Sequence, residues 1–209
     1  MDARREAGAA RREVATRQHE GEELVVARID RTYPTDVEDL WDACTDPERI
    51  ARWFLPVSGD LAQGGHYQLE GNASGTVTRC DRPRGFDATW EFNGQVSWIE
   101  VRFAPDGEGA RLELTHVAPV IPGFWETYGP SAVGIGWDLG ILGLALYLDG
   151  APMAPADVET WSTSDEGREF VAACGHAWGT ASEAIGIAPD DAAARAERTI
   201  AFYTGDEAG

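Results

Sequence analysis

The sequence predicts an α+β fold in which an antiparallel sheet is covered on one side by a long helix, with further helices after it. Between residues 66 and 117, runs of five to eight residues alternate between apolar and polar and are separated by Gly, Pro, Asn and Asp. This pattern is typical of an antiparallel meander. Residues 132–148 repeat apolar side chains at helical spacing. Because one face of the strands is apolar and the other polar, one helical layer is enough to cover the sheet.

The segment before the meander predicts one strand and two short helices. Residues 23–33 alternate as a strand should, and Pro34 ends the strand. Thr35 or Asp36 can cap a helix that reaches Cys44. The pair Asp46-Pro47 starts a second short helix, with Asp at the N-cap and Pro at the first helical position.

The ends of the chain predict a tail and a helical extension. Residues 1–20 hold five Arg, four acids and few larger apolar side chains, so we expect a flexible tail there. Ser162 to Glu166 offers caps for an amphipathic helix, and a last helix starts at Pro189 and ends at Gly205. The expected organisation is therefore a tail over 1–20, the sheet-and-helix domain over 22–149 and a helical extension over 150–209 that packs on the domain or on a partner.

The charge excludes several functions. The 209 residues carry 36 acids against 17 cations, all of them arginine, for a net charge of −19. Nucleic acid is an unfavourable partner for such a chain, because backbone binding needs clustered positive charge. Chemistry that depends on a lysine amine is excluded too.

The sequence predicts a cytoplasmic protein without a metal site or cofactor. Its three cysteines and four histidines are far apart and form no metal-binding motif. The N-terminus has no apolar core of a signal peptide. The most apolar stretch, 132–148, is interrupted by Asp138 and glycines, which argues against a membrane span.

Four segments in the same order resemble one known family. These are RIDRTYPTDVEDLWDACTDPERIARWF, SGTVTRCDRPRGFDATWEF, PDGEGARLELTHVAP and the pair Gly136-Trp137. Together they resemble the START-like (SRPBCC) superfamily, in the branch named for activators of the heat-shock-protein ATPase (AHSA-type). The resemblance covers about residues 24–148 and implies the helix-grip, or Bet v-type, fold, a curved sheet wrapped around a long helix. It also implies an apolar cavity between them that binds lipid-like, aromatic or polyketide-like molecules in many members.

Ten side chains are the expected lining of this cavity, because they lie on the apolar face of the strands, on the short helix or on the closing helix. They are Trp53, Phe54, Tyr67, Trp90, Ile99, Val101, Leu114, His116, Trp137 and Ile141. For each of the five aromatic residues among them, packing within the core is the other interpretation.

Three polar residues lie on or near otherwise apolar stripes. His116 is in register with Leu112 and Leu114, so its imidazole is a candidate general base or ligand-orienting group, with a buried structural histidine as the other interpretation. For Arg28 and Asp138 we expect exposure, with an ion pair or a ligand contact as the alternative.

Three classes of function stay open at this point. The first is a non-catalytic or weakly catalytic binder of a small apolar or aromatic molecule. The second is a protein-interaction or co-chaperone-like regulator, whose C-terminal helices could also form a homodimer. The third is a cyclase-, aromatase- or hydrolase-type enzyme that uses His116.

Overall fold

The computed structural model describes residues 2–206, and the chain divides into two compact units. We call them the terminal unit, which holds the chain up to Ile29, Pro119–Leu139 and the chain from Ala156, and the central unit, which holds Asp30–Ala118 and Gly140–Pro155. The strand β2 and the helix α5 each continue from one unit into the other.

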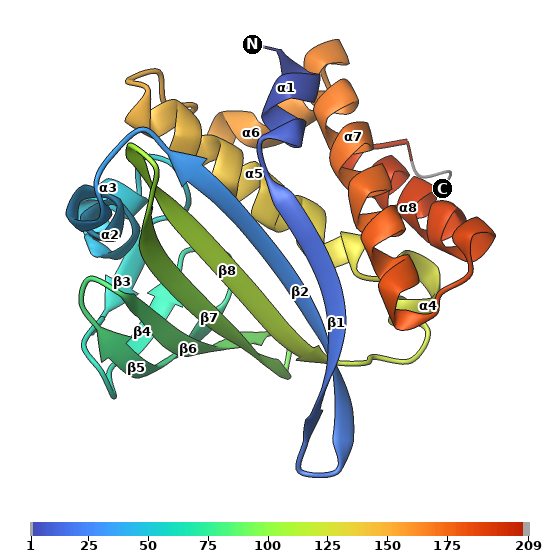
Figure 1. Cartoon of the computed structure of the whole chain (residues 1–209), viewed down its shortest axis with the longest axis horizontal. Coiled ribbons are helices and arrows are strands. Elements are labelled where there is room, and N and C mark those ends of the chain that lie inside the picture. Colours follow the sequence, from blue (N-terminus) through green and yellow to red (C-terminus); the bar gives the residue numbers. More distant parts are fainter. Residues whose placement is uncertain (1, 207–209) are drawn as a thin grey trace. The chain divides into compact units, whose positions relative to one another are not determined.

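Eight strands form one sheet in the order β1-β2-β8-β7-β6-β5-β4-β3 (Figure 1). The strands are β1 (Arg11–His19), β2 (Glu22–Tyr33), β3 (Val57–Gly59), β4 (His66–Leu69), β5 (Ser74–Asp81), β6 (Gly85–Phe92), β7 (Gln95–Asp106) and β8 (Gly109–Pro119). The helices are α1 (Ala3–Gly8), α2 (Val37–Thr45), α3 (Pro47–Ile50), α4 (Phe124–Tyr128), α5 (Ser131–Leu148), α6 (Pro155–Ser162), α7 (Asp165–Ser182) and α8 (Pro189–Thr204), with a short 3₁₀ turn η1 (Glu183–Ile185).

The strands of the central unit follow the predicted meander. From β3 to β8 each strand pairs antiparallel with the next one along the chain. The β6–β7 hairpin turns at Asn93-Gly94, both with positive φ (50° and 76°), the conformation that tight two-residue turns require. In this register Ser97, Ile99, Val101 and Phe103 point to one face and are buried, whereas the residues between Ser97 and Phe103 are only partly buried. We call the buried face the inner face.

The helices before the meander begin where the sequence predicts. The Asp36 side chain accepts from Asp39 N at the start of α2, and Asp46 caps α3, with Pro47 in its first turn. Trp41 on α2 packs edge-on against Phe86 and Phe103, with ring centroids 6.3 and 5.6 Å away. These contacts cover part of the inner face.

The second half of α5, Gly140–Leu148, closes the central unit. The Tyr33 hydroxyl donates to the Ile141 carbonyl (3.2 Å), which fixes the helix to the end of β2. At Gly143 an added Cβ would lie 2.4 Å from the Trp53 carbonyl oxygen, so only glycine lets this segment approach so closely. Gly140 lies against Phe54 at an ordinary contact distance of 3.5 Å.

The terminal unit differs from the expectation for both ends of the chain. In place of a flexible tail over residues 1–20, residues 3–19 form α1 and β1, and Ala3, Ala7 and Val14 are buried. The α7 helix packs against α1, β1 and α8, so the C-terminal helices share a core with the N-terminal segment. The expected boundaries at 22 and 149 therefore do not coincide with the compact units.

A buried ion pair explains why the N-terminal segment is ordered. The Arg12 guanidinium on β1 donates to both carboxylate oxygens of Asp138 on α5, with Nη2–Oδ1 at 2.5 Å. The Trp178 indole N–H on α7 donates to the same carboxylate (2.8 Å). The prediction that Asp138 is exposed is wrong, since only 1% of this residue is accessible. Asp138 is instead buried and forms an ion pair with Arg12, which lies in the segment that was expected to be a flexible tail.

Arg28 also takes part in an ion pair, but at the surface. Its guanidinium lies 3.3 Å from Glu13 on the neighbouring strand, and about a third of its side chain is exposed. Both alternatives considered for this residue, exposure and pairing, therefore apply in part.

By length and composition, α5 could cross a membrane, although the sequence argued against a span there. Of the stretch Ser131–Leu148, however, 56% is buried inside the protein. Such burial is typical of the core helix of a globular protein, and α5 has that role in the packing just described.

Candidate functional site

The inner face of the central unit carries one buried polar pair among apolar neighbours. His116 Nε2 lies 2.8 Å from Ser97 Oγ, and the Ser97 hydroxyl donates to the Trp90 carbonyl (3.0 Å). His116 stands opposite Ile99 in the sheet, and Ser97 stands opposite Trp90. The indole of Trp90 also approaches the imidazole edge-on, with centroids 6.1 Å apart. This group of three residues is the candidate ligand site.

The hydrogen bonds of Ser97 assign the tautomer of His116. A serine has a single hydroxyl hydrogen, and the Trp90 carbonyl, which can only accept, takes it. Ser97 Oγ must therefore accept from the imidazole, which means that His116 Nε2 carries a proton. Burial lowers the pKa of His116 to about 4, so the ring is neutral at pH 7. The pair does not have the arrangement of a histidine that withdraws a proton from serine.

On the inner face, exposure increases along β6 from Ala88 towards the hairpin. The side chains of Ala88, Trp90 and Phe92 follow one another on the inner face, and they are respectively 2% exposed, partly exposed and 45% exposed. Next to Trp90, Ser97 retains 9% and His116 6% of their accessible surface, whereas Leu40 and Leu144 in the core have none. The polar pair is therefore buried, but it lies beside a ring that is partly exposed and near the exposed hairpin end of the inner face.

The central unit contains nine of the ten predicted lining residues. Tyr67, Ile99, Val101, Leu114, His116 and Ile141 are buried, and Trp53, Phe54 and Trp90 are partly exposed. Trp137 is also partly exposed but belongs to the terminal unit. Their role as the lining of a ligand cavity stays a prediction.

Two of the predicted aromatic residues are held by hydrogen bonds to the backbone. The Tyr67 hydroxyl donates to the Thr89 carbonyl (2.6 Å), and burial raises the pKa of this phenol well above its ordinary value. The Trp53 indole N–H donates to the Ala43 carbonyl (3.0 Å). Both rings are therefore held in place by the fold itself.

Sequence reasoning missed Ser97, although the signal was present. The run from Val96 to Phe103 alternates, and the same alternation that places Ile99 and Val101 on the inner face places Ser97 there too. A hydroxyl at a core-facing strand position is unusual enough to mark it as a partner for His116.

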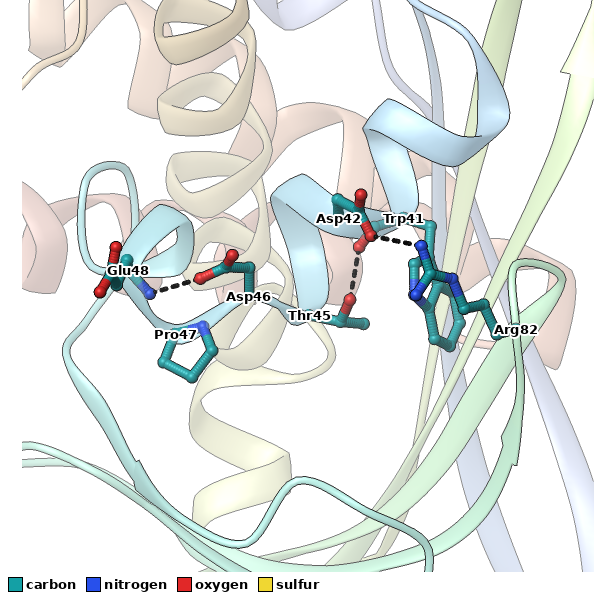
Figure 2. Close-up of a pocket in the computed structure, with 7 residues that line it drawn as sticks. All are labelled: Trp41, Asp42, Thr45, Asp46, Pro47, Glu48 and Arg82. Carbon is teal, nitrogen blue, oxygen red and sulfur yellow. Dashed lines mark hydrogen bonds and ion pairs between the residues drawn. The ribbon is translucent and has the colours of Figure 1, made fainter.

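A separate surface depression lies over α2, α3 and the β5–β6 turn, with a volume of about 670 Å³ (Figure 2). It is lined by Trp41, Asp42, Thr45, Asp46, Pro47, Glu48 and Arg82. As Figure 2 shows, Asp42 pairs with Arg82 (3.2 Å) and Asp46 accepts from Glu48 N (2.8 Å). Thr45 donates to the Trp41 carbonyl (2.8 Å). These polar groups thus serve the local structure of the helices.

The terminal unit exposes several apolar side chains at its surface. Phe124 and Tyr128 on α4 and Phe202 on α8 form a chain of ring contacts, and Phe202 is 57% exposed. The expectation of a homodimer through the C-terminal helices stays a prediction.

The fold and this site define a class of protein. A meander of antiparallel strands combined with a long helix and further C-terminal helices is the architecture of START-like (SRPBCC) proteins. The family described as "Activator of Hsp90 ATPase homolog 1-like protein" matches residues 34–144, and the chain belongs to this family.

Solved structures of several proteins are similar to this chain. The crystal structure of CalU16 from Micromonospora echinospora is 35% identical, covers 67% of this chain and 86% of its own, and has a TM-score of 0.60. The solution structure of CalU16 covers 95% of this chain and 94% of its own at 28% identity and a TM-score of 0.63. Similarity thus includes the N- and C-terminal segments. No curated protein matches in sequence.

A more distant neighbour carries the activity for which the family is named. PFC0360w, an HSP90 activator from Plasmodium falciparum, is 23% identical, with a TM-score of 0.51. The match covers 61% of this chain and 97% of that protein. At this level of identity the likeness concerns the fold alone.

Proposed function

We propose that the protein binds a small apolar or aromatic molecule on the inner face of the central unit, next to Trp90, Ser97 and His116. The observation that carries the proposal is the exposure along β6, which increases from buried Ala88 through Trp90 to exposed Phe92. A sheet face that is apolar, lined by rings and open to solvent at one end is suited to a ligand of that character.

The closing helix supports this proposal. Gly140 and Gly143 bring α5 close to Phe54 and Trp53, so one wall of aromatic rings is held against the helix. Trp53 and Phe54 are themselves in contact, with centroids 5.6 Å apart, and both keep part of their surface accessible. Aromatic side chains of this kind bury a large apolar area on a ligand at a small cost in conformational entropy.

The test is binding of the neutral fluorescent dye N-phenyl-1-naphthylamine. We expect fluorescence enhancement on titration into the protein, and at least tenfold weaker binding by Trp90→Ala, because a central aromatic contact dominates such an affinity. Trp125→Ala is the matched control, since Trp125 is also partly exposed but lies on α4 of the terminal unit. Absence of dye binding, or an equal affinity of Trp90→Ala, would contradict the proposal.

A further inference from the structure

His116 and Ser97, the polar pair on the inner face, each donate a hydrogen bond to another group of the protein. The hydroxyl hydrogen of Ser97 goes to the Trp90 carbonyl, and the Nε2 hydrogen of His116 goes to Ser97 Oγ. A ligand oxygen that can only accept a hydrogen bond therefore gains nothing from these two groups unless one existing bond is broken.

The pair keeps one acceptor position. A hydroxyl oxygen has two lone pairs, and among residues 2–206 the Ser97 oxygen uses only one of them, for the imidazole. Ser97 is somewhat more accessible than His116, with 9% of the residue's surface exposed against 6%, and it stands opposite the partly exposed Trp90. Its oxygen thus keeps an unused lone pair in a residue that stands beside a partly exposed ring.

From this arrangement we infer that the ligand carries an O–H or N–H group that donates to Ser97 Oγ, as a phenol or hydroxyarene does. The inference rests on the proposed function and narrows its ligand class. His116 acts as a positioning residue, because its Nε2–H holds the Ser97 oxygen with its remaining lone pair available. A ligand of equal size without a donor fills the same space but leaves the second lone pair of this oxygen without a donor on a face from which water has been displaced, which is unfavourable.

The first experiment compares 2-naphthol with 2-fluoronaphthalene, two probes of nearly equal size of which only the first donates a hydrogen bond. We expect the protein to bind 2-naphthol about fivefold more tightly, the effect of one net hydrogen bond. In Ser97→Ala the ratio falls to about one, while the affinity for 2-fluoronaphthalene changes less than twofold. Ser182→Ala is the matched control, because it removes another buried hydroxyl that donates to a carbonyl, in α7 of the terminal unit.

The outcomes separate the two proposals. Equal affinity for the two probes, or an undiminished preference in Ser97→Ala, overturns the donor inference and leaves the proposed function in place. If neither probe binds, the proposed function fails for aromatic ligands and the inference fails with it.

A second measurement needs no ligand. The ¹⁵N chemical shifts of the His116 ring at pH 7 report which nitrogen is protonated. We expect a protonated Nε2 and an unprotonated Nδ1. The opposite tautomer would mean that Ser97 donates to the imidazole, which would overturn the inference.

Discussion

A buried polar cluster in each of the two units invites comparison, because the two clusters differ in how completely their hydrogen bonds are made. In the terminal unit, Asp138 receives bonds from Arg12 and Trp178, and Arg12 also donates to the carbonyls of Ala7 and Ala10. In the central unit, the Ser97 oxygen keeps an acceptor position and stands opposite the partly exposed Trp90. A complete cluster holds structural elements together, whereas an incomplete one beside accessible aromatic rings is suited to receive a ligand.

Electrostatics make the same distinction. Burial disfavours the charge on Arg12, but the attraction of Asp138 and their hydrogen bonds outweigh it and hold the pKa of the guanidinium above its ordinary value. For His116, burial acts without a compensating charge and lowers the pKa. The terminal unit therefore buries a charged pair, and the central unit buries a neutral ring.

Removing one partner of the ion pair has the largest expected effect. Asp138→Ala leaves a buried guanidinium and the Trp178 indole without their acceptor, so we expect the free energy of unfolding to fall by about 3–5 kcal/mol in urea titrations. Glu13→Gln is the matched control, because Glu13 lies next to Arg12 on β1 and forms a largely exposed ion pair with Arg28 on β2. Breaking this pair should lower the free energy of unfolding by less than about 1 kcal/mol. Similar losses in the two variants would remove the distinction between the clusters.

Acid should affect the central unit through His116. The unfolded chain takes up a proton near pH 6.5 and the folded one only near pH 4, so this residue's contribution is complete above pH 6.5 and is lost as the pH falls towards 4. The lost stability reaches roughly 3 kcal/mol, because burial lowers the pKa of His116 from 6.5 to about 4 and one pKa unit corresponds to about 1.4 kcal/mol.

Urea unfolding of the protein and of His116→Gln at pH 7, 5.5 and 4.5 measures this loss. All other titrating groups are common to both proteins, so the difference between them reports His116. We expect the variant to show a shallower decline in stability, and parallel declines would show that the imidazole is not protected from protonation.

A smaller effect on stability is expected where the helix α5 packs against Trp53 and Phe54, and it should differ between two glycines of that helix. Gly143→Ala places a methyl group 2.4 Å from the Trp53 carbonyl oxygen, so we expect a loss of about 1–3 kcal/mol in the unfolding free energy. Gly140→Ala meets only the Phe54 ring at 3.5 Å and gains helix propensity, so its stability should be unchanged or higher. The reverse order of these two variants would contradict the packing of α5 against this wall.

Local signals predicted most of the central unit. The caps at Asp36 and Asp46, the Asn93-Gly94 turn and the alternation of β7 each depend on neighbouring residues, and the structure has all of them. The inward position of His116 was predicted by the same alternation. Its partner Ser97 could have been found in this way as well.

The terminal unit could not be predicted in the same way, because its stability depends on contacts between distant residues. Arg12 and Asp138 are 126 positions apart, and the segment around Arg12 has no apolar period that would mark it as a buried strand. Gly134 similarly looks like a helix-weakening residue until the Trp178 indole is placed against it, where a Cβ would lie 2.3 Å from the ring. Only the tertiary structure shows why an arginine fits a buried position of β1 and why a glycine fits this position of α5.

The continuation of β2 and α5 from one unit into the other has a consequence for how this protein can be truncated. A fragment that ends after α5 loses α7 and α8, and with them the Trp178 donor to Asp138. A fragment that begins after β1 leaves Asp138 without its cation. Neither unit can be excised without cutting a strand and a helix, so we expect the chain to unfold in one cooperative transition, as an indivisible folding unit.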